Sequence, residues 1–350
     1  MKVKEMICAI SAGKFDENLK KVYVLDSAVL KQRDRYVELL NTFGELFGFD
    51  RDVNIVSAPG RTEVCGNHTD HNNGKVLAAS INLDAIAVVA KNDDNIIRVK
   101  SQGHRMNLVD LDDLTPDENK FGDSTALVQG VAAGVKELGF EVKGFDACTT
   151  SDVMGGSGLS SSAAFEVLLG SILSYVYNDG KISSVDIAKI SQTAENKFFG
   201  KPCGLLDQMA SSVGTFVTID FKSVKEPVVK KVDFDFSQSG YSLCIVDTHG
   251  NHSDLTDDYA AVRGEMESVA KAMGKSVLRE ISYEDFFCAI PELTGKVNDR
   301  AILRAIHFFN ENKRVDKAVQ CLENNDFEGF KQVIIESGRS SYMLNQNVYS

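Results

Sequence analysis

The sequence predicts an α+β fold arranged as two intimately packed domains. A chain of 350 residues is longer than one typical hydrophobic core needs and shorter than three would need. Helical and extended patterns follow one another without the regular alternation of a doubly wound parallel sheet. The apolar content of 43% and the charged content of 25% are those of a folded globular protein, not of a disordered one.

The first hundred residues predict one helical region and then mainly extended structure. Apolar residues recur at helical spacing towards the end of an opening helical region that runs to about residue 50. Residues 53–57 alternate like a strand, which we expect to stop at Pro59 and Gly60. Residues 76–90 and 96–100 also have the pattern of extended chain, so β structure dominates this part.

Three helices are expected next, and then a return to strands. The first spans residues 124–138 and is stopped by Gly139, and the second spans residues 162–177. Ser183 and Asp186 resemble a capping box that opens a third helix over residues 185–199. Strand patterns come back at residues 215–220, 229–236 and 241–247, and from residue 255 onward the chain is mostly helical.

Charge and cysteine usage exclude several classes of partner. There are 38 basic and 50 acidic residues, a net charge of −12, which argues against nucleic acid or an anionic membrane as a partner. The longest uncharged stretches are too short to span a bilayer, and charges interrupt the short apolar stretch at the start, so we expect no signal peptide. The 7 cysteines contain no CxxC pair, which predicts a reduced, cytoplasmic protein without a structural zinc site. The oligomeric state is not indicated.

The first segment with a chemical signature is residues 155–164, Gly-Gly-Ser-Gly-Leu-Ser-Ser-Ser-Ala-Ala, which runs directly into an amphipathic helix. Glycines let the backbone approach a ligand closely. Hydroxyl groups and free N–H groups then lie at the positive end of the helix dipole, which favours phosphate. The alternative is a flexible loop with an ordinary serine cap. This glycine-serine loop is neither a Walker A loop nor a GxGxxG turn.

The second segment is residues 58–74, a polar turn between two apolar strands. Its many donors and acceptors favour a pocket that hydrogen-bonds a polyol. The alternative is an ordinary loop. His68 and His71 suggest a metal, but a third partner at metal-ligand spacing is missing.

The third segment is residues 199–209, in which Asp207 follows a Gly/Pro turn and Glu195 precedes it in the helix before. Two carboxylates near a phosphate site could divide the work, one holding Mg²⁺ and the other handling a hydroxyl proton. The alternative is that Asp207 only caps a short helix.

Together, in this order and at this spacing, the three segments resemble the GHMP kinase superfamily and, within it, the galactokinase family. Residues 61–74 are similar to the family's sugar signature, residues 156–164 to its nucleotide-phosphate loop, and residues 203–208 to the segment with its catalytic aspartate. The likeness also covers residues 257–259 with Arg263, and residues 304–307 through 336–337. It spans roughly residue 40 to the last residue.

The resemblance implies a two-domain kinase that uses ATP and Mg²⁺ to phosphorylate the anomeric hydroxyl of a hexose between its domains. The N-terminal mixed-sheet domain would comprise residues 1–222 and the helix-rich C-terminal domain residues 223–350. The family's third glycine-rich motif has no counterpart in the sequence. We therefore expect a C-terminally truncated or divergent member, with an incomplete second domain.

The resemblance also implies a role for each residue that matches the family's motifs. Asp207 would orient or deprotonate the sugar hydroxyl, and Arg61 would hold Asp207 ionised and offset charge on the phosphoryl group. The sugar would be contacted by Asn67, His68, Asp70, Gly204 and Tyr259. The phosphates would be held by Gly156, Ser157, Gly158, Leu159, Ser160, Ser161, Ser162 and Ala163. The metal would be held by Ser161 and Glu195.

Three positions depart from the family pattern. Asn67 stands where the family usually has Glu, His71 where it has Tyr, and Met154 where proline is common. Because Asn drops a negative charge and adds a donor, we hypothesise a different hexose, or one with a carboxylate at C6, although galactose is the best single prediction.

Two other functions stay open: a non-catalytic sensor of sugar and nucleotide, and a kinase of the same superfamily for an amino-acid or isoprenoid alcohol. Retention of Arg61 and Asp207 favours an enzyme, and residues 68–70 favour a sugar.

Overall fold

A computed structural model of the chain describes residues 1–155, 158–246 and 256–349. The chain forms two compact units. The first unit is Met1–Arg61 with Ser80–Val213, and the second unit is Thr62–Ala79 with Gly214–Ser350. The strands β1 (Asn54–Cys65) and β2 (Lys75–Lys91) each run from one unit into the other. The predicted domain boundary at residue 222 stays a prediction. In the structure the segment Thr62–Ala79 lies in the second unit, although it is flanked in sequence by residues of the first.

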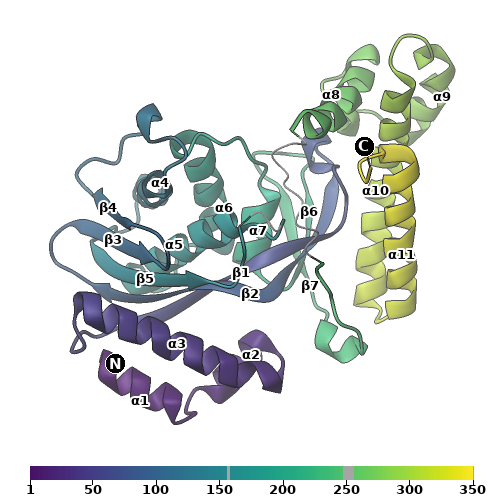
Figure 1. The fold of residues 1–350 in the computed structure, drawn as a ribbon. Helices are drawn as coiled ribbons and strands as arrows, with labels where there is room; N and C mark the ends of the chain where they lie inside the picture. Colours follow the sequence, from purple (N-terminus) through teal and green to yellow (C-terminus); the bar gives the residue numbers. More distant parts are fainter. Residues whose placement is uncertain (156–157, 247–255, 350) are drawn as a thin grey trace. The chain divides into compact units, whose positions relative to one another are not determined.

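The first unit contains a mixed sheet with helices on both faces (Figure 1). Its sheet follows the order β4-β3-β5-β2, in which β3 and β5 are parallel and the other pairs antiparallel. The remaining strands are β3 (Ile96–Ser101), β4 (Met106–Asp110) and β5 (Phe145–Ser151). The helices are α1 (Val3–Ser11), α2 (Asp16–Tyr23), α3 (Asp26–Phe47), α4 (Ser124–Glu137), α5 (Ser161–Tyr177), α6 (Ser184–Thr193) and α7 (Leu206–Val213).

The alternation of side chains along β2 explains why both faces of this sheet are covered. Successive residues of a strand point to opposite faces. Ala85, Ala87 and Val89 belong to the apolar cluster that includes residues of α4, α5 and α6. Ile86 and Val88 belong to the cluster formed with α1, α2 and α3. Each face of the strand therefore buries its own core, and Figure 1 shows α1–α3 on one side of the sheet and α4 and α5 on the other.

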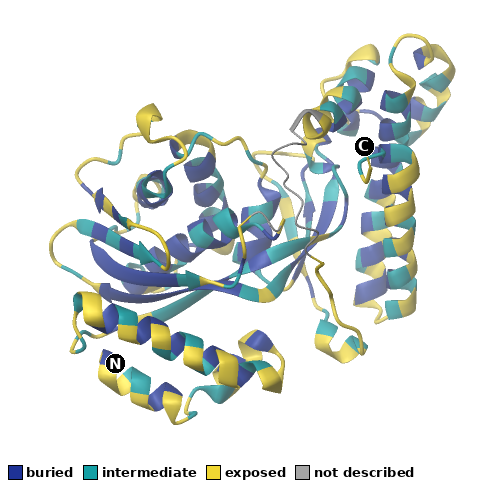
Figure 2. Cartoon of the chain, in the orientation of Figure 1, coloured by how far each residue is buried: buried dark blue, intermediate teal, exposed yellow. Residues whose placement is uncertain are grey.

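The second unit contains the β6 and β7 end of the same seven-stranded sheet, together with four longer helices. Here the Lys75–Ala79 end of β2 pairs with β6 (Phe216–Asp220), which pairs with β7 (Val228–Val232). The helices are α8 (Thr256–Ala272), α9 (Tyr283–Leu293), α10 (Asp299–Glu323) and α11 (Phe327–Ser340). One apolar cluster packs these strands against α10 and α11, and another joins α8, α9 and α10. Figure 2 shows the resulting buried stripes along α10 and α11.

The α+β prediction is confirmed, and most predicted elements are present. Gly139 ends its helix with a φ of +81°, and the Ser183 hydroxyl accepts a hydrogen bond from the backbone of Asp186 at 3.1 Å. The expected helix over residues 185–199 is two elements, α6 and a π-helical turn over Ala194–Phe198. The strands β4 and β5 were not expected.

Two strand predictions were wrong. The first expected strand does not stop at Pro59 and Gly60, because β1 continues to Cys65. Residues 241–246 are not a strand, although they are mostly apolar. Within residues 1–155, 158–246 and 256–349, no helix combines the length and apolar character needed to cross a bilayer. The 7 cysteines are all free thiols.

Candidate active site

The continuation of β1 brings its backbone against the glycine-serine loop. A Cβ atom at Gly60 would lie 2.9 Å from the carbonyl oxygen of Leu159 and 3.1 Å from Val153, so only glycine allows this approach. The backbone N–H of the next residue, Arg61, then donates to Leu159 O at 3.2 Å. Arg61 is thus fixed on a strand rather than on a loop end.

The side chains of Arg61 and Asp207 meet beside the glycine-serine loop. Arg61 Nε donates to Asp207 Oδ1 at 2.8 Å, and Arg61 Nη1 donates to Gly158 O at 2.5 Å. Asp207 lies in the first turn of α7, where the helix dipole favours a negative charge. Its other carboxylate oxygen accepts a hydrogen bond from the Ser160 hydroxyl. The Arg61 guanidinium and the Ser160 hydroxyl therefore both hydrogen-bond to the Asp207 carboxylate in the first unit.

The backbone of the glycine-serine loop is unusual at two described positions. Gly158 has a φ of +76° and Ser160 a φ of +59°, a left-handed conformation that costs a non-glycine residue about 1–3 kcal/mol. Such strain is typical of functional sites, and here it places the Ser160 hydroxyl on Asp207. The helix α5 begins at the next residue, Ser161, so its free N–H groups follow directly. Gly156 and Ser157 lie outside the described residues.

Glu195 forms a second polar cluster in the first unit. It is 2% exposed, and it accepts from the Ser162 hydroxyl at 3.1 Å, from Lys201 Nζ at 3.0 Å and from Gln208 Nε2 at 2.8 Å. The same amide nitrogen of Gln208 lies 3.3 Å from Glu166 Oε2. Burial, and next the charge of Glu195, raise the pKa of Glu166 to about 9. Glu166 is therefore neutral at pH 7.

The cluster has the chemistry of a magnesium site. Mg²⁺ prefers oxygen ligands and is usually held by one or two carboxylates together with substrate phosphates. The hydroxyl that lies beside Glu195 in the described residues is that of Ser162, one position after the expected Ser161. Among residues 1–155, 158–246 and 256–349, no group of three or more His, Cys, Asp or Glu side chains is placed to hold a metal. A magnesium ion here would need phosphate oxygens to complete its shell.

Most residues of the polar turn belong to the second unit, where α10 holds them. His307 Nε2 lies 2.8 Å from the carbonyl oxygen of Asn67, and the side-chain amide of Asn67 donates to Ser341 Oγ at 2.7 Å. Gly66 precedes them with a φ of +105°, and a Cβ atom there would lie 2.6 Å from Lys75 O. The turn is therefore tied down on its backbone and on its side chains.

Besides Asn67, three of the expected sugar-binding residues lie on or beside this turn. The ring of His68 is 5.5 Å from that of Tyr259 and 6.2 Å from that of His71, measured between centroids. Asp70 lies 3.8 Å from His71. Burial, and next the neighbouring His71, lower the pKa of His68 to about 4. A neutral imidazole keeps one donor and one acceptor, which suits sugar hydroxyls. Gly204, by contrast, is an exposed residue of the first unit.

Several residues that support the site had no role in the sequence analysis. In the second unit these are His307 and Glu311, one turn apart on α10, and the Glu311 carboxylate accepts from the backbone N–H of Gly66 at 3.1 Å. In the first unit they are Gln208 and Lys201, which contact Glu195. The spacing of His307 and Glu311 was visible as two polar residues on one helix face. Their partners in the polar turn were not, because Asn67 is 240 positions from His307 and Gly66 is 245 positions from Glu311.

Comparisons with known proteins identify relatives of this chain. Residues 41–91 match the galactokinase galactose-binding signature, and residues 126–215 match the GHMP kinases N terminal domain. The galactokinase of Streptomyces coelicolor is 33% identical over 303 residues, which cover 85% of this chain and 76% of that protein. The galactokinase of Glaesserella parasuis is 36% identical over 310 residues, covering 86% and 77%.

A solved structure shares the fold. The crystal structure of Lactococcus lactis galactokinase complexed with galactose superposes with a TM-score of 0.71 at 24% sequence identity, and covers 89% of this chain and 80% of that one.

Proposed function

The chain belongs to the galactokinase family, and from this premise we propose that it transfers the γ-phosphoryl group of ATP to the anomeric hydroxyl of galactose. It is a sugar kinase, a phosphotransferase that uses ATP. The observation that carries the proposal is the contact between Arg61 and Asp207 at 2.8 Å beside the Ser160 hydroxyl. A protein that only sensed sugar and nucleotide would need neither the guanidinium nor the carboxylate.

Asp207 would act on the sugar hydroxyl. Phosphoryl transfer depends mainly on alignment and on compensation of charge, so one carboxylate that orients or deprotonates the acceptor is sufficient. Arg61 and Ser160 hold the two oxygens of Asp207 in place. Arg61 would also stabilise negative charge that develops on the transferred group.

The glycine-serine loop and the start of α5 would bind the phosphates. The residues proposed for this are Gly156, Ser157, Gly158, Leu159, Ser160, Ser161, Ser162 and Ala163. Glu195 with Ser162, or with the neighbouring Ser161, would hold Mg²⁺, which when bound neutralises charge on the β- and γ-phosphates. Lys201 and Gln208 orient the Glu195 carboxylate.

The sugar would be bound by Asn67, His68, Asp70, Tyr259 and Gly204. The amide nitrogen of Asn67 donates to Ser341, which turns the amide so that its oxygen can serve as an acceptor. That contact is a reason to favour a neutral hexose. The seven free thiols agree with a cytoplasmic location, which we propose for the chain.

A hexose panel tests the substrate. ATP consumption is coupled to ADP detection with galactose, N-acetylgalactosamine, galacturonate and glucose in parallel. We expect turnover with galactose to exceed the others. A preference for galacturonate would instead favour the hypothesis of a C6 carboxylate that rests on Asn67. Galactose binding in a titration without ADP release would identify a sensor.

Replacement of the carboxylate tests the mechanism. Asp207→Ala is expected to lower kcat by at least about 10²-fold, the lower end of what a general base contributes, while galactose binding by titration is retained. The control is Asp179→Ala, whose side chain is 85% exposed and pairs only with Lys181 at 3.2 Å among the ion pairs of the described residues. Near-normal turnover of the Asp207 variant would remove this residue from the mechanism.

A further inference from the structure

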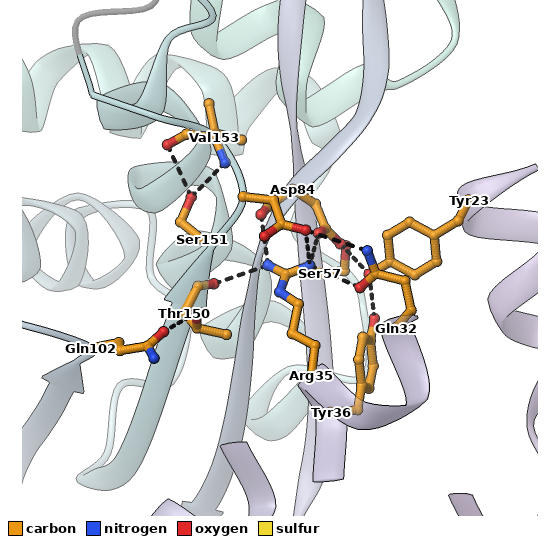
Figure 3. Close-up of polar contacts among 11 residues, drawn as sticks. Tyr23, Gln32, Arg35, Tyr36, Ser57, Asp84, Gln102, Thr150, Ser151 and Val153 are labelled. Carbon is orange, nitrogen blue, oxygen red and sulfur yellow. Dashed lines mark hydrogen bonds and ion pairs between the residues drawn. The ribbon is translucent and has the colours of Figure 1, made fainter. Parts of the chain in front are cut away.

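A buried polar cluster in the first unit centres on Asp84 of β2 (Figure 3). Asp84 is 2% exposed, and its carboxylate accepts three hydrogen bonds. Arg35 Nη1 donates at 2.6 Å, the Ser57 hydroxyl at 2.5 Å and the Tyr23 hydroxyl at 2.8 Å. A buried charge is stable only when it is paired and hydrogen-bonded in this way. The donors come from α2, α3 and β1, so the carboxylate joins three elements to β2.

Arg35 extends the cluster from α3 to the backbone of the sheet. Its Nη2 donates to Asp84 O at 2.9 Å and to Thr150 O at 3.3 Å. Figure 3 shows the guanidinium between these two strands, with Thr150 on one side and Asp84 on the other. Arg35 thus clamps β2 and β5 near the end of β5, from which the chain leaves towards the glycine-serine loop.

Asp152, which follows the last residue of β5, is held at its backbone and at its side chain. Its N–H donates to Asp84 O at 2.9 Å. Its carboxylate accepts from Gln32 Nε2 at 3.3 Å and lies 3.4 Å from Arg35 Nη1. The direction in which the chain enters the glycine-serine loop is therefore set by two residues of α3 and one of β2.

The same cluster reaches Arg61 by two short paths. Val153, next to Asp152, is 3% exposed and packs 3.1 Å from the Cβ position of Gly60, the residue before Arg61. Ser57, bonded to Asp84, lies in β1 four residues before Arg61. Because the interior is closely packed, a shift of Asp152 would move Val153 against the strand that carries Arg61.

We propose that Arg35, Asp84 and Asp152 are positioning residues of the kinase reaction, through which helix α3 holds the base of the glycine-serine loop in register with Arg61. The inference rests on the proposed function, because it assigns the cluster a part in nucleotide binding. It also gives a role to Gln32 and Arg35, which lie outside residues 41–91, the segment that matches the family's signature.

Four variants of one cluster separate positioning from mere stability. Asp152→Ala removes the contacts to Gln32 and Arg35 on the loop side, and its side chain is 25% exposed, so the fold should survive. Tyr23→Phe removes a hydroxyl that contacts Asp84 and Tyr36 but nothing on the loop side. Asp152→Asn keeps an acceptor for Gln32 and serves as the rescue. Gln32→Ala removes the same contact from the other partner.

The readouts are KM for ATP, KM for galactose, kcat, the Kd of the non-hydrolysable analogue AMP-PNP, and the melting temperature. We expect Asp152→Ala and Gln32→Ala to raise KM for ATP and the Kd of AMP-PNP roughly tenfold, a fraction of the loss that a misplacement of about 1 Å can cause. KM for galactose should stay unchanged, and Asp152→Asn should recover most of the loss. Tyr23→Phe should lower the melting temperature by about 2–4 °C and leave nucleotide affinity unchanged.

The proposal is overturned if Asp152→Ala binds AMP-PNP as the unmodified protein does, or if Tyr23→Phe weakens nucleotide binding as much as Asp152→Ala. It is equally overturned if Asp152→Ala and Gln32→Ala change only the melting temperature. Absence of hexose turnover in the unmodified protein would count against the proposed function instead. The ratio of the AMP-PNP dissociation constants would then still decide whether the cluster positions the loop.

Discussion

Replacement of Glu311 by alanine is expected to be among the most destabilising single changes in the second unit. Glu311 is fully buried on α10, and its carboxylate accepts from Gly66 N at 3.1 Å, from Arg314 Nε at 2.5 Å and from the Ser337 hydroxyl. Alanine would leave the N–H of Gly66 and the hydroxyl of Ser337 unpaired, and would leave Arg314, 14% exposed, without its carboxylate.

The magnitude follows from the burial of these partners. Removing one member of a buried ion pair costs about 3–5 kcal/mol, because the other charge stays behind uncompensated. For a chain of this size that is on the order of 10 °C in melting temperature. Glu323→Ala is the matched control on the same helix. Its partner Lys230 is 61% exposed, and an exposed pair contributes about 0–1 kcal/mol.

The assay is urea unfolding of both variants at pH 7, with repeats at lower pH. Burial alone would raise the pKa of Glu311, but His307, Arg314, the Ser337 hydroxyl and the Gly66 N–H together lower it below 4.5. A carboxyl group whose pKa is lowered by folding stabilises the fold above its unfolded pKa and loses that contribution as pH falls through the folded value. The gap between Glu311→Ala and the unmodified protein should therefore narrow below about pH 4.5.

A loss of less than about 1 kcal/mol on Glu311→Ala, equal to that of Glu323→Ala, would refute this reasoning. It would mean that the carboxylate is replaced by water at no cost, and that the polar turn is not held by α10.

Two further predictions concern stability. The pKa of Glu166, raised to about 9 by burial and next by Glu195, means that the folded protein keeps a proton that the unfolded chain releases above about pH 4.5. The free energy of unfolding of the unmodified protein should then fall relative to Glu166→Gln by about 1.4 kcal/mol per pH unit between pH 6 and 8, measured by denaturant titration; parallel profiles would contradict it. Gly66→Ala should cost more than about 2 kcal/mol, since φ is +105° and Lys75 O lies 2.6 Å from the added Cβ. Gly264→Ala in α8, with no atom within 4 Å of the added Cβ, should gain about 0.5–1 kcal/mol, and the same denaturant titration measures both glycine variants.

The features that depend on neighbouring residues could be predicted from the sequence. Gly139 and Ser183 lie at helix ends, where one residue type satisfies one backbone requirement, and both helix ends were predicted correctly. The meeting of Arg61 with Asp207 could be predicted because each lies in a motif of distinctive composition. The α+β class followed from the irregular order of helix and strand patterns.

The features set by distant parts of the chain were missed. β1 continues through Pro59 and Gly60 as a strand that pairs with β2. The Ser211 hydroxyl donates to Pro59 O at 2.7 Å, and the glycine-serine loop lies against Gly60. The sequence of β5 shows no alternation of apolar and polar residues. Its first five residues are all buried, because both faces of the strand are covered. Residues 241–246 are mostly apolar, as a buried strand would be, but such a segment becomes a strand only beside a partner.

The partners of Asp84 illustrate the same limit. Tyr23, Arg35 and Ser57 come from three elements and are 61, 49 and 27 positions away from it. None of them belongs to a recognisable motif. A cluster of this kind becomes visible only when the chain is folded.

The passage of β1 and β2 through both compact units has a practical consequence for dissecting the protein. Because Thr62–Ala79 belongs to the second unit but is flanked by the first in sequence, no single cut of the gene releases either half intact. A fragment ending at residue 213 would retain the Lys75–Ala79 end of β2 without β6, its hydrogen-bonded neighbour. Buried residues such as Val76 and Leu77 would then sit on an open strand edge, and such an edge invites aggregation.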